Sequence, residues 1–268
     1  MNRTGAPSAF GVHVPWFERF LVKVMRAYRD EIDDEGLRAD VQAIIGQEAH
    51  HAFNFRRWTQ RMNAAYPALA GVDDAARRSF ETAFDRGSRR YRIGLTAGYE
   101  TFTFLAGAII LDRYSELMER ADPTLRALWV WHQVEEVEHG AVAFDFYRYF
   151  YPDDEWYRRA MILRAFGHMA LETFHALRAM QRAEGRSLGD RARTWRYFLR
   201  FSADLFVAAL PVFARDYHPR RHPICTDRQN PVAVGWRRWV GAGADARHLD
   251  ADAVDAFLAQ ADTAGSSS

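Results

Sequence analysis

Apolar residues recur every three or four positions along most of the chain, which is the spacing of one face of an α-helix. This pattern predicts helices over residues 14–32, 37–64, 73–120, 123–150, 155–183 and 190–216. No run alternates apolar and polar residues for long enough to predict a strand. We therefore expect an all-α protein, in which short connections place neighbouring helices antiparallel.

Interruptions in the pattern predict where helices end. The acidic pair at 73–74 is expected at a helix N-terminus, where carboxylates offset unpaired backbone amides. Gly87 and Gly94 are expected to divide residues 73–120 into a solvated entry helix and a buried helix. Pro211 predicts a kink or a stop in the last long helix, because proline lacks the backbone N–H.

One domain accounts for most of the chain. Its length and its 49% hydrophobic content allow a substantial single core. We expect an N-terminal tail over 1–12, a helical domain over 13–218, and an irregular C-terminal segment over 219–268. Within that last segment, residues 250–261 are expected to form a short helix, and residues 264–268 to be disordered.

Charge and cysteine content exclude several functions. A net charge of +1, with arginine scattered rather than clustered, argues against nucleic-acid binding. The single cysteine, Cys225, excludes an internal disulfide and a cysteine-based zinc or iron–sulfur site, and fits a cytoplasmic protein. Residues 93–111 approach the length of a membrane span, but their glycines, threonines and Glu100 favour a helix enclosed by other helices.

Polar side chains interrupt the apolar face of the helix that contains residues 131–145. On a helix, His132, Glu136 and His139 fall within roughly a third of the circumference, together with Glu135. Burying an ionised carboxylate costs several kcal/mol unless its charge is compensated. The Glu136-x-x-His139 pair therefore predicts half of a metal site.

The other half is predicted upstream. Glu48-x-x-His51 ends an apolar helical pattern, Glu100 stands alone in the least polar stretch of the chain, and Glu18 lies between aromatic residues. Each half of the chain thus reads as one glutamate, a turn, and then Glu-x-x-His. Two such pairs and two single glutamates form the carboxylate-bridged di-metal site of some four-helix bundles.

The sequence also resembles a known bacterial family. Four segments carry the resemblance: Phe17-Glu18-Arg19-Phe20, Ile45-Gly46-Gln47-Glu48-Ala49-His50-His51, the run from Trp131 to Asp145, and Tyr217-His218-Pro219. They are similar to the family described as predicted metal-dependent hydrolases. The resemblance implies a ferritin-like four-helix bundle with about two additional C-terminal helices. It implies metal ligands at Glu18, Glu48, His51, Glu100, Glu136 and His139. Relatives show another histidine shortly after the first Glu-x-x-His, where this chain has Phe53-Asn54-Phe55.

Several further residues have open roles. Glu135 and Glu138 are expected to pair with arginines or to orient metal ligands. His132 lies one turn before Glu136, and either hydrogen-bonds a ligand or packs in the core. The His168, Glu172 and His175 spacing repeats that of His132, Glu136 and His139. It indicates either a packed helix with buried polar groups or an additional metal ligand.

The ligand set favours particular chemistry. Four carboxylates and two imidazoles suit two iron ions, or an Fe/Mn pair, better than zinc. The first hypothesis is an oxidase or oxygenase that uses O2 and an electron donor on a small hydrophobic or lipid-like substrate. The alternative is a hydrolase that uses metal-activated water, with His132 or Glu135 as the general base. Iron storage is a third reading, which the additional helices after residue 155 argue against. A homodimer is also expected.

Overall fold

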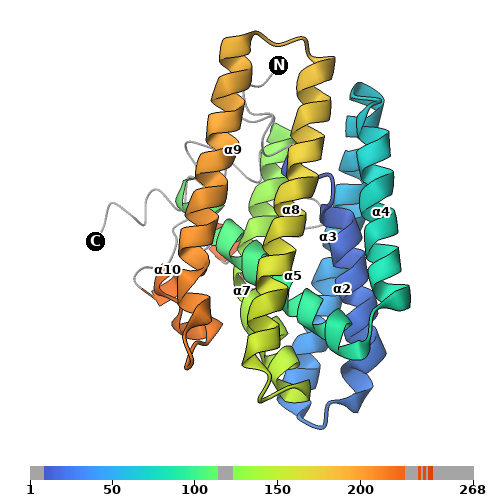
Figure 1. The fold of residues 1–268 in the computed structure, drawn as a ribbon. Helices are drawn as coiled ribbons and strands as arrows, with labels where there is room; N and C mark the ends of the chain where they lie inside the picture. Colours follow the sequence, from blue (N-terminus) through green and yellow to red (C-terminus); the bar gives the residue numbers. More distant parts are fainter. Residues whose placement is uncertain (1–8, 114–122, 227–234, 237, 240, 244–268) are drawn as a thin grey trace.

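The computed structural model describes residues 9–113, 123–226, 235–236, 238–239 and 241–243. Every regular element in this part of the chain is a helix, and no strand occurs in it (Figure 1). The prediction of an all-α fold is therefore confirmed.

Four helices pack around a common interior. They are α2 (Val14–Tyr28), α3 (Glu35–Ala65), α5 (Arg89–Asp112) and α7 (Pro123–Phe150). Helix α2 packs on α3, α3 on α7, α7 on α5, and α5 on α2, which closes a four-helix arrangement. The specific ferritin-like description of this bundle stays a prediction.

Local signals in the sequence explain where these helices begin. The Asp34 side chain accepts a hydrogen bond from the Leu37 backbone N–H at 2.9 Å, and Ser88 accepts one from the Tyr91 N–H at 3.2 Å. Both caps satisfy a backbone donor that the first helical turn leaves unpaired. Pro15 lies in the first turn of α2, where a missing N–H costs nothing.

Two predicted breaks differ from the structure. Gly87 does end α4 (Leu69–Arg86), but Gly94 lies inside α5. Asp73 is not at a helix N-terminus, because α4 begins four residues earlier. Its buried carboxylate instead accepts hydrogen bonds from three side chains of α2 and α3, at 2.6–2.8 Å: Trp16, Arg56 and Asn63. A charge pattern alone could not distinguish a capping aspartate from this internal acceptor.

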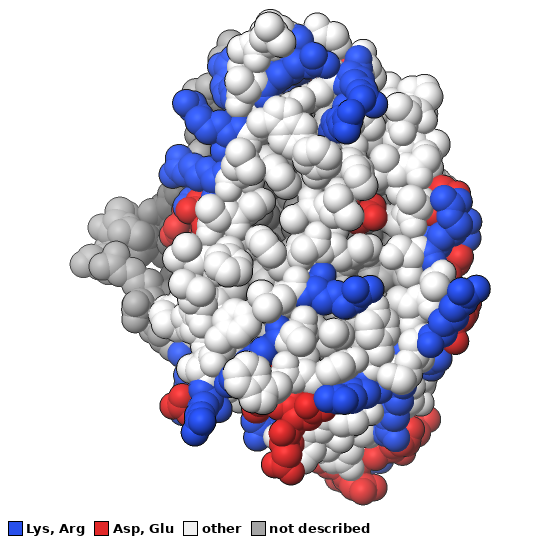
Figure 2. Space-filling view, viewed as in Figure 1, with Lys and Arg blue, Asp and Glu red and all other residues white. Residues whose placement is uncertain are grey.

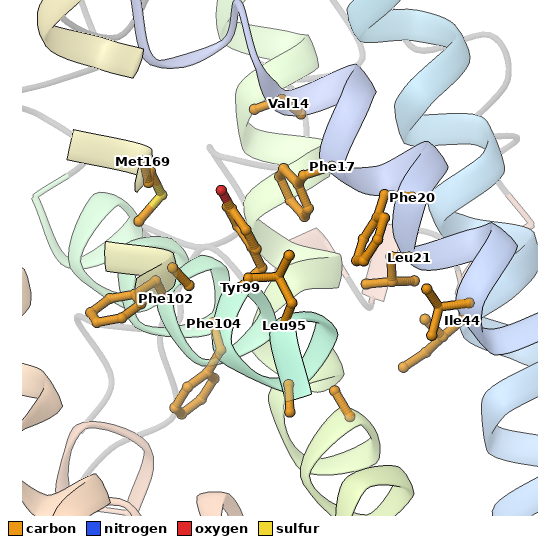
Figure 3. Close-up of a cluster of buried hydrophobic side chains, with 14 of the residues drawn as sticks. Val14, Phe17, Phe20, Leu21, Ile44, Leu95, Tyr99, Phe102, Phe104 and Met169 are labelled. Carbon is orange, nitrogen blue, oxygen red and sulfur yellow. The ribbon is translucent and has the colours of Figure 1, made fainter. Parts of the chain in front are cut away.

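Helix α5 is the core helix of the molecule. By length and composition alone it could cross a membrane, but 89% of its most apolar window is buried inside the protein. Figure 3 shows Tyr99, Phe102 and Phe104 of α5 among apolar side chains of the neighbouring helices, and the Tyr99 ring stacks on Phe17 of α2 at 5.2 Å. Burying each such side chain stabilises the fold by roughly 1.5–3 kcal/mol.

Two further helices cover α5 (Figure 1). They are α8 (Glu155–Ala183) and α9 (Leu188–Ala209), and α9 ends before Pro211 as predicted, passing into a single turn over Leu210–Phe213. Figure 2 shows that the outer surface over α8 and α9 is largely uncharged at its centre. Exposed apolar side chains on these two helices include Leu163, Leu171, Leu199 and Val207.

Residues 217–226, which follow α9, are more regular than expected. They contain two short helical turns, Pro219–Arg221 and Pro223–Thr226, and each follows a histidine whose Nδ1 accepts a backbone N–H two residues later. His218 also bonds Asp145 of α7 at 3.0 Å, which ties this segment to the bundle. The helix predicted over 250–261 and the tail over 264–268 lie outside the described residues.

Candidate metal centre

Seven buried side chains from all four bundle helices converge in the interior. Each is 0–2% exposed. They are Glu18 on α2, Glu48 and His51 on α3, Glu100 on α5, and His132, Glu136 and His139 on α7. The structure therefore brings together the six residues expected as ligands, and places His132 beside them.

Two of the carboxylates each face both Glu-x-x-His histidines. One oxygen of Glu136 lies 3.5 Å from His51 Nδ1, and its other oxygen lies 3.8 Å from His139 Nδ1. Glu48 is arranged in the same way, with one oxygen 3.7 Å from His51 Nδ1 and the other 2.7 Å from His139 Nδ1. Glu48 and Glu136 are called the bridging carboxylates below.

The remaining donors divide between the two sides. His132 Nε2 lies 2.8 Å from Glu18 Oε1 and 3.1 Å from Glu136 Oε1, on the side of His51. Glu100 Oε2 lies 3.8 Å from His139 Nδ1, on the other side. Two donor groups have ligand atoms that all lie within 4.8 Å of one another: Glu18, His51, His132 and Glu136, and Glu48, His51, Glu136 and His139. Glu100 belongs to neither group and lies beside the second.

Apart from Glu18 Oε1 and His132 Nε2, which bond each other, most inward-facing atoms of this cluster lack a hydrogen-bond partner. Both carboxylate oxygens of Glu48, Glu100 and Glu136 are buried without one, as are the Nδ1 atoms of His51 and His139. Leaving buried polar groups unpaired costs about 1–3 kcal/mol each, and more for charged groups. Carboxylate oxygens and imidazole nitrogens are metal donors, so these residues fit a divalent cation.

The outer nitrogens of the two histidines have different partners. His51 Nε2 donates to Glu135 at 2.8 Å, and the Trp131 indole N–H holds the same carboxylate at 3.0 Å. His139 Nε2 donates to the Gln47 amide oxygen at 3.1 Å. With Nε2 as the donor, an imidazole at either position that carries no second proton would present its Nδ1 lone pair to the cluster, as a metal ligand requires.

Burial and mutual repulsion change the acidity of the cluster. Burial raises the pKa of Glu18 to about 8, and burial together with Glu136 and Glu48 raises the pKa of Glu100 well above its usual value. Burial alone would lower the pKa of His132, but Glu136 and Glu18 outweigh it and raise that pKa to about 9. Protons therefore occupy part of the cluster when no cation does.

Aromatic rings surround the histidines. The edge-to-face neighbours are Trp131 against His51, with ring centroids 4.8 Å apart, and Phe55 against His132, at 4.7 Å. Phe55 lies in the stretch Phe53-Asn54-Phe55, which follows the first Glu-x-x-His. Here a phenyl ring occupies that stretch and packs against His132.

The other predicted group lies apart from this cluster. His168 contacts the Tyr99 hydroxyl through Nδ1 and the Ser79 hydroxyl, at 3.1 Å, through Nε2. Glu172 is 3.7 Å from the same Nε2, and the His175 side chain is exposed. Among the described residues, the candidate metal-donor groups do not include His168, Glu172 or His175.

Sequence reasoning left two contributions undecided or unnoticed. The sequence leaves His132 open between hydrogen bonding to a ligand, packing in the core and a role as general base, although its i,i+4 spacing to Glu136 places both side chains on one helix face. Gln47 was not assigned a role, and only its position next to Glu48 pointed to the centre. The side chain of Glu138 is not among those that the structure describes.

The fold and the cluster define an all-helical protein with a buried carboxylate–histidine centre of the kind that binds metal ions. The model of the family described as "Predicted metal-dependent hydrolase" matches residues 2–223, and the chain belongs to that family. Neither the curated proteins nor the solved structures gave a match.

Proposed function

We propose that the protein is a hydrolase that depends on two divalent metal ions. The observation that carries the dinuclear part is the orientation of the bridging carboxylates. Glu48 and Glu136 each direct one oxygen toward His51 and the other toward His139. The hydrolytic part rests on the family to which the chain belongs.

The donors would be shared between two ions. The bridging carboxylates would contact both, Glu18 and His51 would serve one, and Glu100 and His139 the other. Bound divalent ions would supply Lewis acidity and would activate water for attack on the substrate. The four carboxylates would compensate the positive charge, which makes the buried position tolerable for both partners.

The surrounding residues position the ligands and exclude water. Glu135 holds His51 from outside, and the indole of Trp131 fixes that carboxylate. Glu135 therefore acts as a positioning residue in this proposal rather than as a general base. The aromatic rings against His51 and His132 favour a small hydrophobic substrate, because they offer it no polar partner.

A second candidate is an O2-dependent oxidase or oxygenase. The observation that favours it is the donor set, in which four carboxylates and three imidazoles lie fully buried. Such a set suits Fe(II) and Mn(II), and burial protects oxidative chemistry from water. This reaction would also need an electron donor.

The two candidates differ in their need for O2. Metal-free protein would be reloaded without O2 with Fe(II), Mn(II) or Zn(II), and assayed on a panel of apolar esters, lactones and amides. We expect hydrolysis that needs metal and proceeds without O2. No turnover under these conditions, together with substrate-dependent O2 consumption by the Fe(II) form, would establish the second candidate instead.

Variants test whether the assigned residues carry the activity. Glu136→Ala and His139→Ala should each lose bound metal and activity while keeping their helical circular dichroism, because only buried polar atoms are removed. Glu81→Ala, on the exposed surface of α4, is the control and should keep both. Full metal occupancy in both site variants would contradict the proposed ligands.

A further inference from the structure

The two sides of the centre have unequal donors. On one side, called the first position, Glu18 is accompanied by two imidazoles, His51 and His132. On the other, called the second position, Glu100 lies 3.8 Å from His139 Nδ1. His51 belongs to both donor groups and is assigned to the first position, because its Nδ1 also lies 4.0 Å from Glu18. Because the bridging carboxylates are common to both, the difference lies in the nitrogen count.

His132 Nε2 faces the first position, where it donates to Glu18 and would lose its proton on becoming a ligand. Its Nε2 lies 2.8 Å and 3.1 Å from carboxylate oxygens of Glu18 and Glu136, and its ring centroid is 4.6 Å from that of His51. The side chain is 2% exposed, and its other nitrogen, Nδ1, lies within hydrogen-bond distance of the Gln133 amide. Its Nε2 therefore faces carboxylates of the cluster rather than solvent.

The outer hydrogen bonds add to the difference. The first-position histidine, His51, donates to a carboxylate, Glu135, whereas His139 donates to the neutral amide of Gln47. A carboxylate acceptor draws the Nε2 proton more strongly and makes the opposite nitrogen a better donor to a metal. The larger number of imidazole ligands and their higher basicity thus both favour tighter metal binding at the first position.

We propose that the two metal positions are filled in order and by different preference, with the first position, completed by His132, taking its ion before and more tightly than the second. This inference rests on the dinuclear centre proposed above. Additional imidazole favours ions late in the divalent series, such as Zn(II), while the oxygen-rich second position suits Mn(II). One equivalent of each should therefore give a mixed Zn/Mn centre.

Metal titration tests the order without any assay of activity. Metal-free protein would be titrated with Zn(II) by calorimetry. We expect two separate steps of one equivalent each. His132→Gln should weaken the first step by at least about tenfold, since even partners outside the ligand set change affinity by 10–100-fold. His139→Gln should weaken the second step, while leaving the first.

His50→Gln provides the matched control. His50 lies next to His51 on α3, but its side chain is exposed, so both binding steps should be unchanged. Circular dichroism of each metal-free variant would check that the helices are intact.

A mixed-metal experiment needs no variant. Wild-type protein given one equivalent of Zn(II), then one of Mn(II), and passed through a desalting column should retain both in a 1:1 ratio. Its Mn(II) paramagnetic resonance spectrum should be that of an isolated ion rather than of a coupled pair. Retention of a single metal type, or a coupled Mn(II) pair, would overturn the inference.

The remaining outcomes separate the two proposals. Two identical steps in the wild type, or a first step unchanged by His132→Gln, would overturn the unequal positions while keeping the dinuclear centre. Binding of fewer than two equivalents would overturn the dinuclear centre, and this inference with it. Two unequal steps in a protein that hydrolyses nothing would overturn only the proposed reaction.

Discussion

At the scale of single residues, Glu18 and His132 share a hydrogen bond inside the bundle, and each holds a proton more firmly than in water. The pKa of Glu18 is raised to about 8 and that of His132 to about 9. Both groups are therefore mainly protonated near pH 7 when no metal is bound. A metal ion must displace these protons, because only the deprotonated atoms are ligands.

Metal affinity should consequently depend steeply on pH. Between pH 7.5 and 6, we expect the apparent affinity for the first ion to fall by about tenfold per pH unit for each proton released. Competition with a chromophoric chelator would measure it. Glu18→Gln should reduce the slope by about one proton, and a wild-type affinity independent of pH would contradict the protonated state.

Residue spacing predicted the side chains that converge at the centre better than it predicted their individual roles. Glu18, the candidate supported only by its order along the chain, lies fully buried in the cluster. The spacing of His132 gave its helix face, but not whether another helix would bring a carboxylate to its Nε2. The contact between His132 and a carboxylate depends on how α2 packs against α7, and no local sequence pattern predicts that packing.

At the scale of helices, glycine allows α5 to approach its neighbours closely. A methyl group on Gly98 would lie 2.6 Å from the Met161 carbonyl oxygen of α8, and one on Gly107 would lie 3.4 Å from the Glu136 Cβ of α7. The distance at Gly98 is shorter than an ordinary van der Waals contact, and the distance at Gly107 is at the lower limit of one. The position of Glu100 relative to Glu136 therefore depends on residues without a side chain.

Gly98→Ala should destabilise the protein. The added methyl meets backbone that cannot move independently, so we expect the free energy of unfolding to fall by about 1–3 kcal/mol despite the better helix propensity of alanine. Gly167→Ala, on α8, has open space around the added methyl and should raise it by about 0.5–1 kcal/mol. Urea unfolding would measure both, and equal effects would contradict the packing argument.

Helix identity followed from periodicity, but some boundaries did not. The glycine that ends α4 and the glycine inside α5 look alike in sequence. They differ because the Gly87 position leaves the helical conformation with ψ at 141°, while Gly94 faces Tyr157 and Met161 of α8. Gly94 therefore stays helical where α5 packs against α8, a helix more than sixty residues further along the chain.

At the scale of the whole molecule, the four bundle helices each contribute at least one carboxylate to the same interior point. Without a cation, these charges oppose the packing that buries them. A bound ion that prefers the folded state should therefore raise the stability of the entire bundle.

Metal removal should lower the thermal stability of the protein. At a free metal concentration about a hundredfold above Kd, one bound ion adds about 2.7 kcal/mol to the free energy of unfolding, which corresponds to a rise in Tm of roughly 5–10 °C. Scanning calorimetry with and without a chelator would measure the change. Glu136→Ala should show no such dependence, and a wild-type Tm insensitive to chelator would refute the stabilising role.

The global arrangement was predictable only in outline. Short connections between helices indicated antiparallel neighbours, and the structure has them. The two turns after α9 were not predicted, because their caps use histidine side chains and a distant acceptor, Asp145. The expected homodimer stays a prediction.

The complete enclosure of the seven donors has a kinetic consequence. With these side chains 0–2% exposed in the described part of the chain, we expect exchange of a bound ion to need a local opening of the neighbouring helices. The lifetime of a bound ion is then set by the opening rate of the bundle, and a protein assembled with the wrong metal would keep it long after its surroundings had changed.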